Sequence, residues 1–345
     1  MSLIWLVFLF LSITPSASAL DISAPTVPAY GAAIMPEQTE SFGSALMEML
    51  HKGLLHIHPD LREAFQISII LFAVVMLVSL LNAFPGNRKR IIAVSAGCLM
   101  GTLLIKNSKA MIGLAAETIT ELSSYGKILF PVMTAAMSAQ GGVTASAALY
   151  TGTAAFDMLL SGLIDKLLVP LVYLYLALAV GNCATGESLL KRIQDLIKGL
   201  VSWGLKTLLT IFTTYMSITG VVSGTTDAAA LKAAKLTISS VVPVVGSILS
   251  DASESILVGA GLMKNAAGIY GILAILALFL EPFLKIGIQY LMLKGTAAIC
   301  SIFGTKEVTA IIDDFAIAMG LLLAMTGSVC LLLLISMICF LKGVG

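Results

Sequence analysis

Long apolar blocks separated by short polar stretches make up most of this chain. The block 66–84 contains nineteen residues without a charge, which is long enough for a helix to cross the ~30 Å hydrocarbon core of a bilayer. Comparable blocks follow at 91–105, 159–180, 200–222, 266–280, 286–303 and 315–341. Because apolar stretches of this length are typical of membrane helices, the pattern predicts an all-α, polytopic membrane protein with about six to eight membrane segments.

The scarcity of charge strengthens this interpretation. Hydrophobic residues form 58% of the chain and charged residues 11%, whereas about a quarter of a soluble globular chain is charged. So few charged residues cannot cover a water-exposed surface. A helix in lipid forms all of its backbone hydrogen bonds internally and needs no polar side chains on its surface. Transmembrane β-barrels show short alternating strands instead of long apolar blocks. The net charge of +1 gives no reason to expect nucleic-acid binding.

The N-terminal region has the features of a secretory signal. An apolar run near the start is followed by Ala-Ser-Ala at 17–19, a pattern typical of a cleavage site. We therefore expect a signal peptide at 1–19, and because no Lys or Arg precedes the run, an uncleaved anchor is the alternative. Residues 20–65 would then form an extracytoplasmic segment, and the three-and-four spacing of apolar residues from Phe42 predicts an amphipathic helix there.

A basic cluster predicts the orientation of the first helices. Arg88, Lys89 and Arg90 directly follow the first apolar block, and short basic loops stay in the cytoplasm. An external N-terminus and one membrane crossing place this loop on the same side, so the two signals agree. We expect residues 66–127 to form a helical hairpin followed by a more polar outer helix.

A second basic cluster, Lys191 and Arg192, lies in an amphipathic stretch. The apolar residues of 187–200 fall on one helical face, and the basic residues lie elsewhere on the helix. This pattern is typical of a helix that lies in the membrane interface. We expect it on the cytoplasmic side, where Lys and Arg accumulate.

Two segments, 130–156 and 236–263, are apolar but rich in residues that weaken a membrane span, such as Gly and Ser. Such segments pack against other helices or re-enter the membrane more often than they face lipid. They are also the best sequence indication of a polar path through a transporter-like protein. The candidate residues for a lining or a re-entrant segment are Pro131, Gly141, Gly142, Pro243, Asp251 and Glu254.

The same segments suggest an internal duplication. Pro131 aligns with Pro243, and Pro170 aligns with Pro282, at the same offset of 112 residues. Gly- and Pro-interrupted segments in matching places mark duplicated transporter halves. The alternative is that membrane helices resemble one another because they share an apolar solvent. The predicted membrane repeats are 128–235 and 236–345.

One pair of opposite charges lies inside an apolar block. Glu281 and Lys285 are four residues apart, the spacing that places both side chains on one helical face. Charges within a bilayer are costly and usually face a bundle interior or a water-filled path. The pair either neutralises itself in a structural role or marks a polar path, and the sequence leaves both alternatives open.

Motifs of well-known enzyme classes are absent from the sequence. It contains no phosphate-binding loop G-x-x-x-x-G-K-[ST], no zinc motif H-E-x-x-H and no nucleophile elbow G-x-S-x-G. The five cysteines show neither metal-binding nor disulfide spacing. We therefore expect no enzyme activity, no cofactor and no metal, and an energy source, if one is needed, would belong to a partner.

Several stretches together resemble one protein family. Phe-Thr-Thr-Tyr-Met-Ser-Ile-Thr-Gly at 212–220 continues into Ser-Gly-Thr-Thr-Asp at 223–227, followed by Val-Pro-Val-Val-Gly at 242–246 and Asp-Ala-Ser-Glu-Ser at 251–255. With Glu-Pro-Phe-Leu-Lys at 281–285, these stretches resemble the stage III sporulation protein AE family. The resemblance covers nearly all of the chain after residue 40.

The resemblance implies a role in endospore formation, in the mother-cell membrane that surrounds the forespore. Expected partners are the other stage III A-operon proteins, including ring-forming members and an ATPase-like member, and stage II sporulation protein Q across the intermembrane space. The implied function is that of a membrane subunit of a channel or secretion-like complex between the two cells. A structural scaffold that anchors the ring proteins, and an autonomous secondary transporter, are the alternatives. The family brings no catalytic motif.

Overall fold

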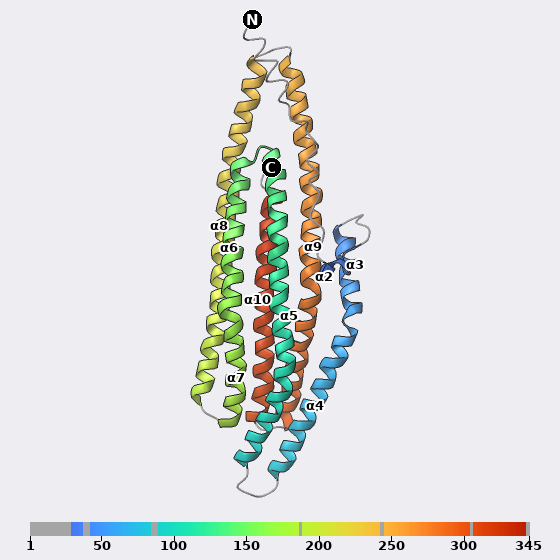
Figure 1. Ribbon diagram of the computed structural model, residues 1–345, viewed down its shortest axis with the longest axis vertical. Coiled ribbons are helices and arrows are strands. Elements are labelled where there is room, and N and C mark those ends of the chain that lie inside the picture. The colour runs from blue at the N-terminus through green and yellow to red at the C-terminus, as the bar shows by residue number, and fades with distance from the viewer. Residues whose placement is uncertain are drawn as a thin grey trace.

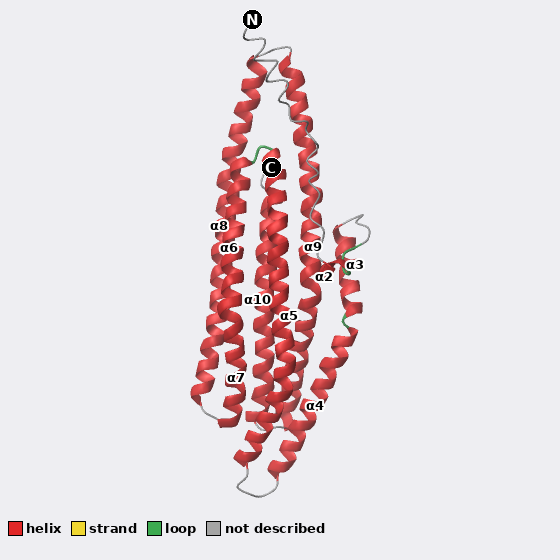
Figure 2. Ribbon diagram, in the orientation of Figure 1, coloured by secondary structure: helices red, strands yellow, loops and turns green. Residues whose placement is uncertain are grey.

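The computed structural model describes residues 29–36, 42–83, 89–185, 188–241, 245–303 and 306–342, and the regular structure in these ranges is entirely helical (Figure 2). This confirms the predicted all-α class. The predicted signal peptide at 1–19 lies outside the described residues, so it stays a prediction.

Six long passes of the chain form an elongated bundle (Figure 1). Two short helices precede them, α2 (Ala29–Ala32) and α3 (Phe42–His56). The passes are α4 (His58–Ala83), α5 (Lys89–Ala139), α6 (Val143–Leu163) continued through the π-helix η1 (Ile164–Leu168) into α7 (Val169–Thr185), α8 (Ser188–Val241), α9 (Val245–Phe303) and α10 (Lys306–Lys342). Consecutive passes run in opposite directions along the bundle.

Five helical segments of the described chain are long and apolar enough to cross a membrane. They are His58–Ala83, Val143–Thr185, Leu189–Thr219, Ala267–Phe303 and Val308–Lys342. The remaining pass, α5, carries charged residues along its middle, including Lys109 and Glu117. The structure therefore agrees with a polytopic helical membrane protein, as the apolar blocks predict.

Helix α10 lies in the centre of the bundle, where it contacts α5, α6, α7, α8 and α9. Large apolar side chains from its whole length are fully buried, among them Phe315, Leu322, Met325 and Phe340. The ring of Phe340 stacks on Phe130 of α5, with the ring centroids 5.8 Å apart. Because lipid is as apolar as these side chains, their contribution to the assembly of the helices comes mainly from close van der Waals packing.

The outer helices are longer than a bilayer requires. At 1.5 Å per residue, the 54 residues of α8 and the 59 residues of α9 extend about 80 and 90 Å, against a hydrocarbon core of ~30 Å. Figure 1 shows the end of α8 and the start of α9 projecting together beyond α10. A substantial part of these helices therefore lies outside any single bilayer core.

Two predicted helix boundaries are wrong. The expected break between the span 91–105 and an outer helix 106–127 does not occur, because α5 is continuous from Lys89 to Ala139. The expected interfacial helix at 187–200 is the beginning of α8, which continues to Val241. Charged residues indicated a boundary in both places. Some of them, such as Lys106 and Arg192, are exposed on the surface of the continuous helix. An exposed charge changes the surface of a helix without ending it.

Prolines also interrupt the helices less than expected. Pro282 lies between the predicted blocks 266–280 and 286–303 but inside the continuous helix α9, and Pro131 lies inside α5. A proline removes one backbone hydrogen bond and kinks a helix, yet membrane helices tolerate it where neighbouring groups compensate. Pro170 differs, because it is the second residue of α7 and lies two residues after the end of the π-helix η1.

The internal duplication stays a prediction. An offset of 112 residues would place the α5–α6 connection, at 140–142, on 252–254, which lies within α9. The expected repeat boundaries at 128 and 236 fall inside α5 and α8. The proline pairs therefore do not correspond to matching turns in the described helices.

Candidate functional site: charged and polar clusters between the helices

Lys285 of α9 joins two carboxylates from different helices. Its Nζ lies 2.9 Å from Oε1 of Glu281, one helical turn away, and 3.7 Å from Oδ2 of Asp60, near the start of α4. The three side chains are between 20% and 30% exposed. The sequence spacing correctly indicated the Glu281–Lys285 contact, whereas Asp60 was not foreseen. Asp60, Glu281 and Lys285 thus form an ion-pair cluster that links α4 to α9. Its formal charge is −1.

Gly141 and Gly142 form the connection between α5 and α6. Gly141 has a φ of 92°, its N–H donates to Ser138 O (2.9 Å), and the N–H of Gly142 donates to Met137 O (3.2 Å). These two bonds around a left-handed glycine define a Schellman helix end. The segment 130–156 therefore consists of the end of α5, a sharp turn at 140–142 and the start of α6, and the two helices are antiparallel.

Hydroxyl groups support this turn from both sides. The Oγ atoms of Ser138 in α5 and Ser146 in α6 lie 2.6 Å apart. Pro131 lies slightly more than two turns before the end of α5 and does not line the connection itself. Of the residues predicted to line a path here, the two glycines thus have a clear structural role, because they let the chain reverse direction.

Several predicted residues cannot be placed by their side chains. Arg88 and Pro243 lie outside the described residues. Lys89 and Arg90 begin α5, and Asp251 and Glu254 belong to α9, but the structure describes only their helical backbone. Their proposed roles in topology and in a lining stay predictions.

Lys191, predicted as an orientation signal, reaches into the bundle. Its Nζ lies 2.7 Å from Oδ1 of Asp314, near the start of α10, and the Asp314 side chain is only 2% exposed while that of Lys191 is 41% exposed. The neighbouring Arg192 is exposed. The partly exposed Lys191 therefore neutralises the buried carboxylate of Asp314.

Asp314 has further partners from two helices. The hydroxyl of Tyr175 in α7 donates to Oδ1 at 3.2 Å, and Nε2 of Gln194 in α8 lies 3.3 Å from Oδ2. The same amide nitrogen is 3.4 Å from the backbone oxygen of Tyr175. A buried carboxylate is costly unless it is paired and hydrogen-bonded. We call Asp314, Lys191, Tyr175 and Gln194 the Asp314 cluster; it holds α7, α8 and α10 together.

Sequence reasoning missed the Asp314 cluster because its members are far apart in the chain. Lys191 and Asp314 are separated by 123 residues. The available signal was the pair Asp313–Asp314 next to a strongly apolar block, where an acidic residue needs a partner. Asp313 has one as well, since its Oδ1 lies 2.5 Å from Nζ of Lys294 in α9.

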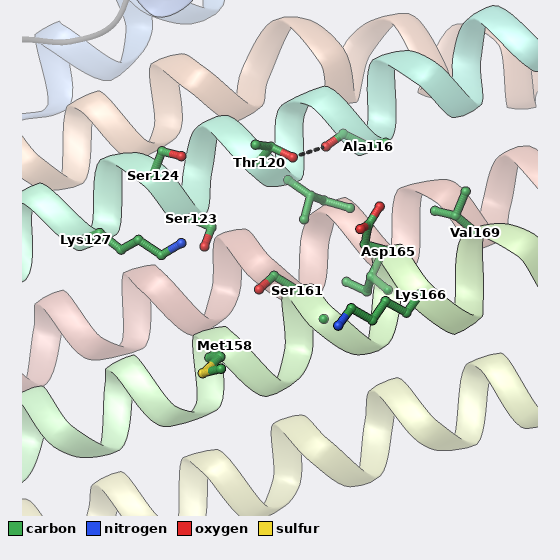
Figure 3. A pocket seen from close by; sticks show the side chains of 13 residues that line it. Ala116, Thr120, Ser123, Ser124, Lys127, Met158, Ser161, Asp165, Lys166 and Val169 are labelled. Carbon is green, nitrogen blue, oxygen red and sulfur yellow. Dashed lines mark hydrogen bonds between the residues drawn. The ribbon is translucent and has the colours of Figure 1, made fainter.

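A second buried carboxylate lies between α5 and α6. Oδ2 of Asp157 accepts a hydrogen bond of 2.5 Å from Ser123, and Oδ1 is buried with no hydrogen-bond partner among the described residues. Ser123 also borders a half-open pocket of about 320 Å³ between α5 and the segment α6–η1–α7. Lys127 and Lys166 border the same pocket (Figure 3). Here the structure gathers hydroxyl, carboxylate and ammonium groups that the sequence did not bring together.

Comparison with known proteins gives one consistent result. Residues 32–343 match the model of the family described as stage III sporulation protein AE. The chain is also 28% identical, over 241 residues, to stage III sporulation protein AE of Bacillus subtilis (strain 168). That alignment covers 69% of this chain and 60% of the relative, so the match spans less than two thirds of the relative's length. No solved structure matches.

Proposed function

The chain belongs to the stage III sporulation protein AE family, and we propose that it is a membrane subunit of a channel or secretion-like complex that joins the mother cell to the forespore during endospore formation. The observation that carries the proposal is the family match over residues 32–343. The five helical segments that are long and apolar enough to span a membrane are consistent with an integral subunit.

The proposed setting is the mother-cell membrane around the forespore. The proposed partners are the other stage III A-operon proteins, including ring-forming members and an ATPase-like member, with stage II sporulation protein Q on the forespore side. The chain has no nucleotide-binding loop, so in this proposal any ATP-driven step belongs to a partner. We propose a non-enzymatic role for the chain itself.

A structural scaffold is the second candidate. The lengths of α8 and α9, about 80 and 90 Å at 1.5 Å per residue, favour it, because helices of this length can hold partner proteins away from the bilayer. The buried polar residues along α10, including Thr326, Ser328 and Ser336, fit either role. In a scaffold they stay dry, whereas in a channel some of them meet water when the complex assembles.

Deletion of the gene in an endospore-forming host tests the proposal. We expect forespores to be engulfed but to express late forespore genes poorly, and the number of heat-resistant spores to fall by several orders of magnitude. The full chain supplied from a second locus should restore both. Normal spore numbers and normal late expression in the deletion strain would refute a required role.

Cysteine accessibility then separates the channel from the scaffold. In a chain whose native cysteines have been replaced, Ser336→Cys and Thr153→Cys place thiols at a buried contact between α10 and α6, where the two hydroxyls are 2.9 Å apart. A channel predicts reaction with a small water-soluble thiol reagent in sporulating cells, while a scaffold predicts protection. Lys342→Cys, at the exposed end of α10, controls for delivery of the reagent.

A further inference from the structure

The pocket between α5 and the segment α6–η1–α7 brings two lysines to one space. Figure 3 shows Lys127 of α5 and Lys166 of η1 entering it from opposite ends, on either side of Ser123 and Ser161. Neither lysine forms a salt bridge with another residue of the described chain. Two ammonium groups that face one cavity provide six N–H donors and favour an anion with several acceptor oxygens.

The wall beside Ser123 offers acceptors instead of donors. The Ser123 hydroxyl donates its proton to Oδ2 of Asp157, so its lone pairs remain for a donor in the pocket. Asp157 is buried and is not among the residues that border the pocket, so Ser123 is the group that presents this acceptor to a ligand. One acidic side chain, that of Asp165, borders the pocket itself. The ligand should therefore carry hydroxyl or ammonium donors as well as an anionic group.

The backbone at the pocket is irregular in a way that suits a binding site. Ile164–Leu168 forms a π-helix, closed by the bond from the Val169 N–H to Ile164 O. Pro170 has no N–H to donate to the carbonyl of Lys166, so regular α-helical bonding is already interrupted there. π-Helical turns of this kind occur frequently at functional sites. Asp165 and Lys166 both belong to this turn and border the pocket, and their side chains point in different directions (Figure 3).

We propose that this pocket binds a phosphate ester whose alcohol carries hydrogen-bond donors, with the phosphate between Lys127 and Lys166 and the donors toward Ser123 and Asp165. The volume of about 320 Å³ accommodates such a headgroup and excludes long acyl chains. The exposed apolar side chain of Met158 borders the pocket and offers a surface along which acyl chains would lie. Basic pockets between membrane helices bind lipid headgroups, so a phospholipid and a soluble phosphate ester are the two sources of this chemistry.

Binding to the purified full chain tests the proposal. After delipidation in detergent, the chain is titrated with phosphatidylglycerol, followed by native mass spectrometry, and with glycerol 3-phosphate, followed by calorimetry. Lys127→Gln and Lys166→Gln should each weaken binding about tenfold, since each removes one charge-assisted contact. Lys127→Arg, which keeps the charge, should retain most of the affinity. Lys109→Gln, at an exposed lysine elsewhere on α5, is the matched control and should bind normally.

The two probes identify the source of the ligand. Lysine-dependent binding of phosphatidylglycerol alone assigns a lipid site, and lysine-dependent binding of glycerol 3-phosphate assigns a soluble phosphate ester. Circular dichroism of each variant confirms that its helices are intact. The proposal is overturned if neither probe binds the folded chain, or if the variant with both Lys127→Gln and Lys166→Gln binds as tightly as the natural chain.

Discussion

Nζ of Lys191, in the first turn of α8, lies 2.7 Å from Oδ1 of Asp314, near the start of α10. Together with Tyr175 and Gln194 it gives the buried carboxylate donors from two different helices. Because α10 is the central helix of the bundle, this contact fixes how its first turns sit against α7 and α8. Lys191 thus has a structural role as well as its predicted role in orientation.

Lys191→Met should destabilise the protein by about 2 kcal/mol. The change leaves Asp314 buried without its cation, and breaking a buried pair from one side is strongly unfavourable, although the partial exposure of Lys191 lowers the cost. Thermal unfolding in detergent measures the effect. Adding Asp314→Leu should recover part of the loss, while Lys198→Met, at an exposed lysine on the same helix, should change little. Equal stability of the Lys191 and Lys198 variants would show that the pair contributes nothing.

The α5–α6 turn should distinguish its two glycines. Gly141→Ala places a side chain at a φ of 92°, which costs about 1–2 kcal/mol. Gly142 has a φ of −86°, which alanine adopts without strain, so Gly142→Ala should be close to neutral. The midpoint of chemical unfolding checks both variants. A larger loss for Gly142→Ala than for Gly141→Ala would contradict the Schellman geometry.

Gly152 should be intolerant of even a methyl group. A Cβ there would lie 2.0 Å from Cε1 of Tyr215 in α8, whose hydroxyl is held by a 3.1 Å bond to Ala148 O. Gly152→Ala should therefore separate α6 from α8 and lower stability by about 1–3 kcal/mol. Gly204→Ala, on a part of α8 with open space around the glycine, should be neutral or slightly stabilising. Thermal unfolding of the two variants, compared side by side, checks this contrast.

Lys285 should matter more than either of its acidic partners. Lys285→Met leaves Glu281 and Asp60 close together without a cation, whereas Glu281→Gln leaves Lys285 paired with Asp60. We expect the lysine variant to accumulate at clearly lower levels in the membrane and Glu281→Gln to accumulate almost normally. Immunoblots of membrane fractions, with spore counts from the same cultures, measure both. Normal accumulation of Lys285→Met without sporulation would instead favour the polar-path interpretation of the pair.

The sequence could predict the class of fold because long uncharged blocks such as 66–84 have few alternatives to a membrane helix. It also indicated the Glu281–Lys285 contact, which depends only on helical spacing. Sequence reasoning misplaced helix ends near Lys106 and Arg192. Hydropathy does not show whether a charged residue ends a helix or lies on the exposed face of one that continues. The Asp314 cluster was beyond sequence reasoning, since Lys191 and Asp314 meet only once α8 and α10 pack.

The pocket at η1 illustrates the same limit at shorter range. Asp165 and Lys166 are adjacent, and adjacent residues point about 100° apart on a regular helix, so their spacing gives no reason to expect both at one pocket. Both lie in the π-helix η1 and border the pocket. Pro170 was a visible signal for an irregular helix, but its effect on the preceding residues could not be read from its position alone.

Association with the other sporulation proteins is the most direct test of the central claim. An affinity-tagged full chain that supports normal sporulation is purified from membranes of sporulating cells in mild detergent, and co-purifying proteins are quantified by mass spectrometry. A subunit of the proposed complex should bring down the ring-forming and ATPase-like stage III A-operon members in fixed ratios, and an unrelated tagged membrane protein should not. Purification of the functional chain without these proteins, even after chemical crosslinking in the intact cells, would contradict the claim.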